Sequence, residues 1–570
     1  MVDRQGRGSS DRMRLARRVR EEIRTVECSG GPPRYPRPMT ILPTRGGARL
    51  YRPYEPDVGG GWDAVVIGSG MGGMCCAAAL SRFGRRVLLL EQHYVPGGYT
   101  HMFARRGFHW DVGVHALGEM GEGELPRRML DWLTDGSVRM VPLGDPYDRF
   151  LYPDGFEIDF PSTKQAFRAV LAERFPEQAE NIAAYFRCVG KGARGAHIYF
   201  LLKSLPRWMD VAGSRVASWL GRDWWGTTTE QVLDEVGIEG RLRNVLSAQW
   251  GYFGSVPRAS SFAMQALVHC HFGNGAYFPQ GGSKSLAEGL LAPVLDAGGD
   301  VRTKAPVERI LIEGGRAVGV RMADGSEVRA DWVISAAGAR NTVDRLLPAP
   351  ERDAPWAGRV RSIGDSPSYL CLNLGFEGDI AAAGASPANL WLMSNWDLDQ
   401  SEWNVEDPAS IPHILYVSFP SLKDPDHDPG PTRRHTGECV TFIPWEAVRR
   451  WENTDIRTRE EGYEAFKRDI TERLLACLRE RLPGVMDLLV HHELSTPLTA
   501  EYFVHASRGA IYGLEATPER FTCRDLRPRT PIPRLLMTGV DSASIGVISA
   551  MASGMLTASV LEKRAYTKMV

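Results

Sequence analysis

The sequence predicts an α/β fold in which one parallel-sheet domain is assembled from three separated segments and an α+β domain is inserted between them. A strand–helix–strand pattern with a glycine-rich turn occupies residues 62–91, α/β patterning returns at 277–345, and a last strand and helix follow at 534–563. The stretches between these segments are rich in helical patterns and aromatic residues, or mixed in character. They are therefore assigned to the inserted domain.

Length, composition and charge describe a globular chain with more than one core. The 570 residues correspond to roughly three to four domain-sized units. The net charge of -1 provides no overall field that would recruit nucleic acid. Nine scattered cysteines without a C-x-x-C pair indicate a reducing compartment and show no metal-site spacing. We find neither the apolar core of a signal peptide nor an apolar stretch of about 18 residues, so we expect a cytoplasmic protein.

Residues 1–60 are expected to form a basic, disordered tail. Arginines crowd residues 12–20, several prolines are present, and three consecutive glycines at 59–61 precede the first strand. Such a composition favours disorder. A short basic helix over residues 12–26 is the alternative, and ordered structure is expected to begin at Trp62.

The first segment has the pattern of a dinucleotide-binding βαβ unit. An apolar stretch ends in Gly68-Ser-Gly70-Met-Gly72-Gly73, an alanine-rich helical pattern follows, and a second apolar stretch ends on Glu91. Gly68 and Gly70 allow a tight turn close to a pyrophosphate, Gly73 allows the helix to pack on the strand, and the helix dipole favours phosphates. The carboxylate, 18 positions after the last glycine, can accept hydrogen bonds from ribose hydroxyls. A glycine-rich turn without a ligand is the alternative.

Two further motifs follow this unit. Gly97 and Gly98 permit backbone conformations that are closed to other residues, so a ligand could lie against the main chain there. An ordinary turn is the alternative. The second motif, residues 107–118, contains His115, and His101 lies between the two motifs with no role that the pattern decides.

The middle segment supplies further strands. A glycine turn at 281–282 starts a helix, and Val307 begins a strand. Residues 318–330 have the pattern of a hairpin, and 332–338 that of a buried strand ending in small residues. These elements extend the sheet begun by the first segment.

The last segment combines a strand, a polar turn and a helix. Its strand runs into Thr538-Gly539-Val-Asp541, and a helix of small residues is expected from about Gly546 to Lys563. This order places a carboxylate close to a helix N-terminus, where backbone amides carry partial positive charge.

Together these segments resemble the FAD-dependent family of phytoene desaturases, carotenoid isomerases and retinol saturases. The resemblance covers less than a third of the chain. Its motifs are residues 66–73 with 91–98, residues 278–282, and residues 495–497, 509–513 and 538–541. Residues 108–118 resemble retinol saturases more closely than phytoene desaturases, because saturase-like members carry a histidine at the position of His115.

The resemblance implies a discontinuous, Rossmann-like FAD-binding domain of the glutathione-reductase type. This domain is expected to comprise residues 61–120, 276–345 and 531–565, and the substrate-binding domain residues 121–275 and 346–530. One glycine fingerprint of this strength is present. If NAD(P) serves as the electron partner, it therefore has no second Rossmann unit to bind.

The resemblance also implies a set of cofactor-binding residues. These are Gly68, Gly70, Gly72, Gly73, Glu91, Gly97, Gly98, Val307, Gly539, Asp541 and Gly546. The glycines of the first turn would hold the pyrophosphate, Glu91 the adenosine ribose, and Val307 the adenine through its backbone. Asp541 would accept hydrogen bonds from the ribityl chain or the pyrophosphate side. Backbone amides near Gly546 would face the pyrimidine edge of the flavin, where charge develops on reduction.

His115 is the candidate catalytic residue, because its imidazole could donate or accept a proton beside the flavin ring. A packing or hydrogen-bonding role is the alternative. Tyr512 is expected either to line the substrate tunnel or to be a core aromatic. No third ligand can be placed beside the pair His491 and His492, so the pair is taken as structural and no metal site is expected.

Residues 196–225 carry an amphipathic pattern with a bearing on partners. Apolar residues, among them Trp208 and Trp219, fall on one helical stripe that basic residues flank. Tryptophan beside basic residues suits a membrane interface, and Pro206 is expected to kink or divide the segment. A helix packed over the substrate tunnel is the alternative.

The sequence therefore predicts an FAD-dependent oxidoreductase that acts on carbon–carbon double bonds of an apolar polyene, a carotenoid or retinoid, by saturation, desaturation or isomerisation. The protein is expected to contact membranes peripherally and not to bind nucleic acid. One alternative is an amine-oxidase-like flavoenzyme, although no aromatic cage can be placed in the sequence. The other is a non-catalytic, prenyl-binding protein of the same fold, against which the intact glycine run, Glu91 and Asp541 argue.

Overall fold

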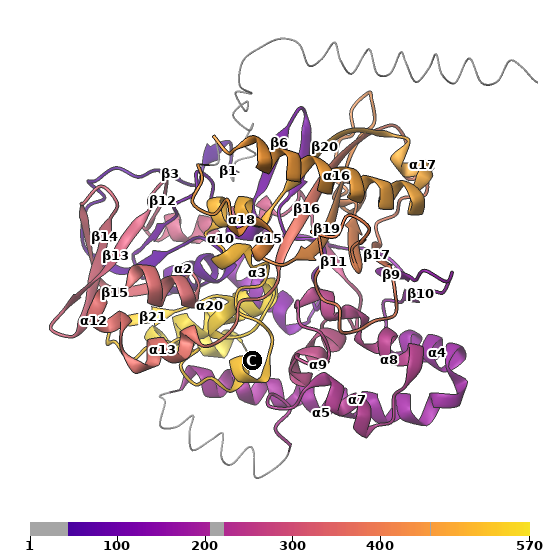
Figure 1. Cartoon of the computed structure of the whole chain (residues 1–570). Coiled ribbons are helices and arrows are strands. Elements are labelled where there is room, and N and C mark those ends of the chain that lie inside the picture. The colour runs from indigo at the N-terminus through magenta and orange to yellow at the C-terminus, as the bar shows by residue number, and fades with distance from the viewer. Residues whose placement is uncertain (1–43, 206–221, 456–457, 570) are drawn as a thin grey trace, which may run out of the picture. The chain divides into compact units, whose positions relative to one another are not determined.

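The computed structural model describes residues 44–205, 222–455 and 458–569 (Figure 1). The expected basic helix at 12–26 lies outside the described residues. So do Pro206, Trp208 and Trp219 of the amphipathic segment.

A parallel sheet contains the glycine-rich segment. Its strands follow the order β21-β15-β4-β5-β12-β3, and every neighbouring pair is parallel. Their bounds are Leu535–Met537 (β21), Glu327–Ser335 (β15), Trp62–Ile67 (β4), Val87–Leu90 (β5), Asp300–Thr303 (β12) and Arg52–Pro53 (β3). Apart from β3, the strands come from the three segments that the sequence predicts, and the discontinuous α/β fold is confirmed.

The first half of β15 also belongs to an antiparallel layer. It pairs with β14 (Arg316–Met322), which pairs with β13 (Val307–Glu313). This is the hairpin expected over residues 318–330, since Val320 lies opposite Val328. Val307 therefore lies at the beginning of its strand, as expected.

The two faces of the parallel sheet are covered differently. Helices α2 (Met71–Arg82), α10 (Lys284–Asp296) and α20 (Val547–Leu561) pack on one face, and α2 and α20 lie side by side (Figure 1). Residues alternate along β4, so that Ala64 and Val66 face these helices. Val65 and Ile67 face the other side, where they pack with the antiparallel layer and α13 (Pro355–Arg361).

Residues 44–60 are not a tail, which corrects the expectation that order begins at Trp62. Two short strands, β1 (Thr44–Arg45) and β2 (Ala48–Arg49), pair with each other, and β3 adds to the edge of the parallel sheet. Leu50 and Tyr51 are buried, and Arg52 Nη2 donates to Asp300 Oδ2 at 2.8 Å. These contacts hold a segment that its composition alone assigns to disorder.

A second, seven-stranded sheet follows the order β10-β9-β17-β18-β19-β16-β20 and is antiparallel except between β9 and β17. The bounds are Glu157–Phe160 (β10), Asp148–Leu151 (β9), Asn389–Met393 (β17), Ile414–Ser418 (β18), Arg434–Ile443 (β19), Ser368–Glu377 (β16) and Leu489–Ser495 (β20). Leu415 and Val417 face α16 (Glu461–Arg481), whereas Ile414 and Tyr416 face the opposite way. Alternation along β18 thus directs an aromatic side chain away from α16.

A group of helices shares the core on that other face of the second sheet. They are α4 (Lys164–Arg174), α5 (Ala179–Ser204), α7 (Thr229–Glu235), α8 (Gly240–Ser247) and α9 (Phe262–His271). Further elements are β6 (Met102–Arg105), β7 (Phe108–Asp111), α3 (Leu125–Thr134), α11 (Ala339–Asn341), α14 (Pro420–Lys423) and α18 (Pro497–Val504). The expected domain boundaries stay a prediction, because residues 40–570 cluster as one unit.

Candidate functional site

A cavity of about 770 Å³ brings together most of the residues that the sequence singles out. The expected residues that line it are Gly68, Gly70, Gly72, Glu91, Gly98, His115, Val307, Tyr512, Gly539, Asp541 and Gly546. Gly73 and Gly97 do not line it. The cavity therefore joins the loops of the parallel sheet to the inner face of the second sheet.

The four glycines of the first turn have different roles. A Cβ on Gly73 would lie 2.1 Å from the carbonyl oxygen of Gly68, and one on Gly72 would lie 2.5 Å from Gly539 Cα. These two positions require glycine because backbone packs directly on them. A Cβ on Gly70 would meet no heavy atom within 4 Å, so this position leaves its backbone open to the cavity.

Glu91 anchors the loops at the end of β5. Its Oε2 accepts hydrogen bonds from Ser69 N at 2.9 Å and from Ser69 Oγ at 2.5 Å, and its Oε1 accepts from His93 N at 2.8 Å. Ser69 Oγ in turn accepts from Gly97 N at 3.0 Å. Sequence reasoning missed Ser69, although a hydroxyl inside a glycine run signals such a role. Gly97 acts through this bond and not by lining the cavity.

Two helix N-termini open onto the same cavity. Helix α2 begins after Gly70 and α20 after Gly546, and neither of these two described helices has a side-chain cap. The first residues of both, Met71 and Val547 among them, line the cavity. Uncapped amides and the helix dipole make both ends suitable for anionic groups.

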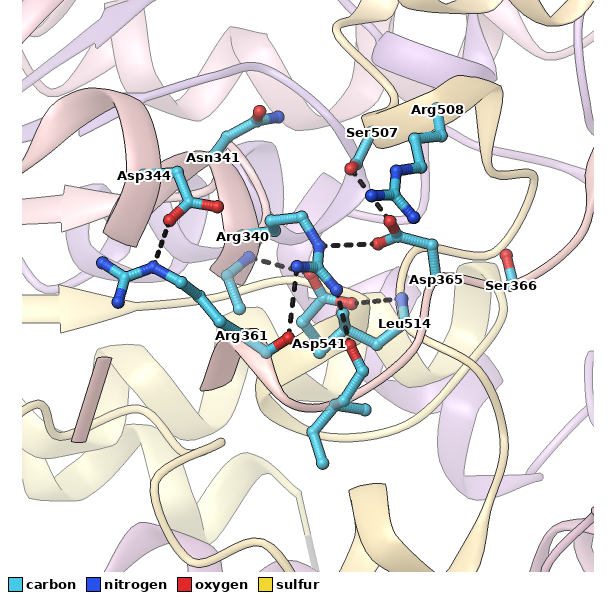
Figure 2. Close-up of polar contacts among 12 residues, drawn as sticks. Arg340, Asn341, Asp344, Arg361, Asp365, Ser366, Ser507, Arg508, Leu514 and Asp541 are labelled. Atoms are coloured by element: carbon cyan, nitrogen blue, oxygen red, sulfur yellow. Dashed lines mark hydrogen bonds and ion pairs between the residues drawn. The ribbon is translucent and has the colours of Figure 1, made fainter. Parts of the chain in front are cut away.

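Asp541 connects three segments that are distant in the sequence. Its Oδ2 accepts a hydrogen bond from Ala339 N at 2.8 Å, and its Oδ1 accepts one from Leu514 N at 3.0 Å (Figure 2). The carboxylate is 7% exposed and still lines the cavity. Asp541 thus has a structural role, which is to join these segments by hydrogen bonds, in addition to any contact that it makes with a ligand.

A second group of polar contacts lies beside Asp541, and no sequence motif points to it. Arg340 Nε donates to Asp365 Oδ1 at 2.9 Å, and Ser507 Oγ donates to Asp365 Oδ2 at 3.1 Å (Figure 2). Arg340 also donates to the carbonyl oxygens of Arg361 and Ile363, at 3.3 and 2.5 Å. The group ties the loop after α18 to the loop after α13.

Aromatic side chains form part of the cavity lining. The residues that we call the aromatic chamber are Tyr252, Trp391, Tyr416, Phe442 and Tyr512. The ring of Trp391 lies 4.5 Å from that of Tyr416 and 4.8 Å from that of Tyr252, between centroids. Tyr512 OH donates to the carbonyl oxygen of Gly251 at 2.7 Å. Tyr512 therefore lines the cavity, and its hydroxyl is already satisfied by the main chain.

His115 lies between the chamber and a buried polar cluster. Its ring meets that of Tyr416 edge-on at 5.2 Å, and its Nδ1 lies 3.3 Å from Glu438 Oε2. Burial, and secondarily the charge of Lys423, lower the pKa of His115 to about 3, so the imidazole is neutral at physiological pH. Lys423 Nζ donates to the His115 carbonyl oxygen at 2.9 Å and fixes this stretch of backbone.

The other histidines considered above lie outside the cavity lining. The Nδ1 atom of His101 lies 2.5 Å from the Gly98 carbonyl oxygen, which supports the second glycine pair. The ring of His491 stacks on Phe108, 6.1 Å between centroids. Among the described residues, no group of three or more histidine, cysteine, aspartate or glutamate side chains is arranged to hold a metal ion.

The groups that line the cavity fit FAD. Gly70 offers bare backbone, α2 and α20 offer uncapped amides, and Glu91 offers a buried carboxylate at the end of β5. A pyrophosphate, a ribose and an electron-accepting ring system need this combination of groups.

Comparisons with known proteins agree with this geometry. Residues 71–561 match the family described as flavin containing amine oxidoreductase. All-trans-retinol 13,14-reductase of Danio rerio is 31% identical, and that of Homo sapiens is 32% identical, each over 88% of this chain and 86% of its own length. The chloroplastic prolycopene isomerase of Arabidopsis thaliana is 26% identical over 79% of this chain and 74% of its own length.

Solved structures share the fold. An oxidoreductase from Methanosarcina mazei has a TM-score of 0.58 at 19% identity and covers 88% of this chain and 99% of its own. Cyclohexylamine oxidase from Brevibacterium oxydans has a TM-score of 0.55 at 16% identity and covers 89% and 98%. The chain belongs to the flavin-containing amine oxidoreductase family, in the branch of its retinol reductase and prolycopene isomerase relatives, and is an FAD-dependent oxidoreductase.

Proposed function

We propose that this protein uses FAD to saturate, desaturate or isomerise carbon–carbon double bonds of an apolar polyene of the retinoid or carotenoid class. The observation that carries the proposal is that one cavity is lined both by the glycine-rich turn and by the aromatic chamber. Aromatic and aliphatic walls suit a conjugated hydrocarbon. The relatives that share 31 to 32% identity are reductases of all-trans-retinol by name.

We assign the cofactor contacts as follows. The backbone at Gly68, Gly70 and Gly72 and the N-terminus of α2 hold the pyrophosphate, and Glu91 receives the adenosine ribose. Gly98 lies against the same turn, because a Cβ there would lie 3.0 Å from Gly70 Cα. Gly73 and Gly97 support this turn from behind.

The remaining contacts lie toward the flavin. The backbone at Val307 meets the adenine, and Gly539 and Asp541 lie along the ribityl chain. The amides that follow Gly546 face the pyrimidine edge of the ring. FAD held by these residues would supply hydride exchange with the double bond. His115 supplies or removes the accompanying proton, and the chamber excludes water from the reacting carbons.

The electron partner and the membrane are further parts of the proposal. A nicotinamide nucleotide, NAD(P)H, is the proposed reductant for saturation. Peripheral membrane contact is proposed because an insoluble polyene has to enter from a bilayer. Within the described residues, no helix combines the length and apolar character needed to cross a membrane.

The described part of the amphipathic segment at 196–204 belongs to α5. The C-terminal end of this helix is held by Arg527, whose Nη2 donates to the Leu202 carbonyl oxygen at 3.0 Å.

The membrane contact predicts a result for Trp208 and Trp219. Replacing both with serine is expected to lower co-sedimentation with liposomes, because tryptophan side chains anchor proteins at bilayer interfaces. The exposed Tyr502 of α18 provides a control, because Tyr502→Ser removes an exposed aromatic ring that lies outside residues 196–225 of the sequence. Equal sedimentation of the double variant and the parent protein would remove membrane contact by this segment from the proposal.

The test of the function is anaerobic photoreduction of the purified yellow protein, followed by a panel of polyenes and, separately, a panel of amines. Reoxidation of the reduced flavin by a polyene is the expected result and gives the direction of reaction. Reduction of the oxidised flavin by an amine, with no polyene active, would favour the amine-oxidase alternative. A colourless protein that refuses added FAD would favour the prenyl-binding alternative.

A further inference from the structure

A buried carboxyl group lies next to His115, the histidine that lines the cavity beside the aromatic chamber. Glu438 is on β19, paired with Asn373 of β16 and Ser418 of β18, and its side chain has an exposed fraction of 0%. Its Oε2 is 3.3 Å from His115 Nδ1. In the described part of the chain, neither carboxyl oxygen of Glu438 has a hydrogen-bond partner of good geometry, and neither has His115 Nδ1.

Such an acid is held in its neutral form. A buried carboxylate is strongly disfavoured, so burial raises the pKa of Glu438 well above its usual value. The charge of Asp111, at the end of β7, raises this pKa further, whereas the charge of Lys423 on α14 and the backbone of Asp111 lower it by a smaller amount. At neutral pH the group therefore has an O–H that can donate, and the neutral imidazole of His115 has a nitrogen that can accept.

The other charged groups around Glu438 already have hydrogen-bond partners. Lys423 Nζ donates to Asn389 Oδ1 at 2.5 Å and to Ser418 Oγ at 2.7 Å. Asp148 on β9 accepts from Tyr252 OH and Asn389 Nδ2, each at 2.8 Å.

Asp111 Oδ1 accepts from Ser283 N at 2.6 Å. Within this cluster, Glu438 is thus the acid whose proton has His115 Nδ1 as its nearest acceptor. Because Nδ1 is buried against Glu438, Nε2 is the ring nitrogen left for the cavity.

We infer that Glu438 supplies the proton that His115 delivers to the substrate. This inference rests on the proposed function. In the saturating direction, one carbon of the double bond receives a hydride from the reduced flavin, and the other receives the proton of His115 Nε2. The π bond breaks and two C–H bonds form, while the Glu438 proton moves to Nδ1. Glu438 ends as a carboxylate and His115 as its Nδ1–H tautomer. Before the next turnover Nε2 takes up a proton from the cavity and the Nδ1 proton returns to Glu438, which restores the starting state. NAD(P)H would restore the reduced flavin.

Glu438→Gln separates proton supply from orientation. The glutamine amide can still donate a hydrogen bond to His115 Nδ1, but it cannot release a proton. We expect the single-turnover reoxidation of reduced flavin by a polyene to slow by about 10²-fold or more. Flavin content and the affinity for the polyene are expected to stay unchanged, because neither depends on the transferred proton.

Glu377→Gln is the matched control. Glu377 lies on β16, the strand next to β19, and its Oε1 accepts from Arg434 Nε of β19 at 3.1 Å. The same chemical change is thus made in the same strand pair, away from His115. The control is expected to react at the parental rate. Equal rates for Glu438→Gln and the parent protein would overturn the inference.

A spectroscopic measurement decides the question independently of turnover. The infrared spectrum of the flavin-loaded protein is expected to contain a protonated-carboxyl C=O band that disappears in Glu438→Gln and shifts in His115→Phe. If no polyene reacts even with the parent protein, the proposed function fails while this measurement still reports on the pair. If the glutamine variant does not fold, the shift in His115→Phe decides. A spectrum in which neither substitution changes such a band would overturn the inference.

Discussion

At the scale of single residues, neighbouring glycines of one motif differ in what they contribute. Gly73→Ala is expected to destabilise the apoprotein by ~1–3 kcal/mol or more, because its Cβ would lie 2.1 Å from the Gly68 carbonyl oxygen. Gly70→Ala is expected to leave the melting temperature of the apoprotein unchanged and to weaken FAD binding about tenfold, or ~1.4 kcal/mol. Thermal melting and flavin titration of both variants distinguish packing from cofactor contact. A reversed pattern would contradict the assignment.

Replacing Glu91 is expected to weaken FAD binding through the loss of a side-chain acceptor. Glu91→Ala removes the proposed ribose acceptor and also frees Ser69, whose amide and hydroxyl both donate to this carboxylate. Loss of a charged acceptor costs ~1–3 kcal/mol, so FAD is expected to dissociate during gentle purification. Glu55→Ala, at an exposed carboxyl of the same unit, is the control. Unchanged flavin content in the Glu91 variant would refute the assigned role.

At the scale of elements, a buried histidine joins helices α5 and α9. The Nε2 atom of His269 lies 3.0 Å from Tyr185 OH and 3.1 Å from the Leu246 carbonyl oxygen. Burial lowers the pKa of His269 to about 4, below the usual 6.5. Its neutral form therefore contributes stability that is fully present above pH 6.5 and is lost as the pH falls toward 4.

The corresponding prediction compares the parent protein with His269→Gln. The free energy of unfolding of the parent is expected to decline relative to the variant by up to ~1.4 kcal/mol per pH unit between pH 6.5 and 4. Denaturant titrations at several pH values measure this difference. Because only the difference is used, the other titrating groups of the chain cancel. A difference that does not change with pH would show that the histidine is solvated in the folded state.

At the scale of the whole molecule, Asp541 holds together segments that lie far apart in the sequence. Asp541→Asn leaves one of the amides of Ala339 and Leu514 without an acceptor, so we expect a loss of ~1–3 kcal/mol in the apoprotein. Melting temperatures with and without FAD measure the effect. An equal fall in melting temperature with and without FAD would mean that Asp541 only joins segments of the protein. A larger loss in the loaded protein would support its contact with the cofactor.

Contacts across the whole molecule explain which features could not be predicted from the sequence. The βαβ pattern through Glu91 and the hairpin at 318–330 depend on local periodicity, and both were predictable. The contact of Arg340 with Asp365, the aromatic chamber and the approach of Glu438 to His115 join residues that only the folded chain brings together. Residues 44–60 were misassigned because their order depends on pairing with β12, a partner that local composition does not contain.

The contact between α2 and α20 has a consequence for biosynthesis. A Cβ on Gly554 of α20 would lie 2.7 Å from the carbonyl oxygen of Gly72, so the two backbones touch through residues without side chains. The glycine turn is translated early, whereas its neighbouring helix leaves the ribosome after every strand of both sheets. A nascent chain therefore lacks one wall of the cofactor site until α20 has been translated, and we expect flavin to bind only after α20 has packed against α2.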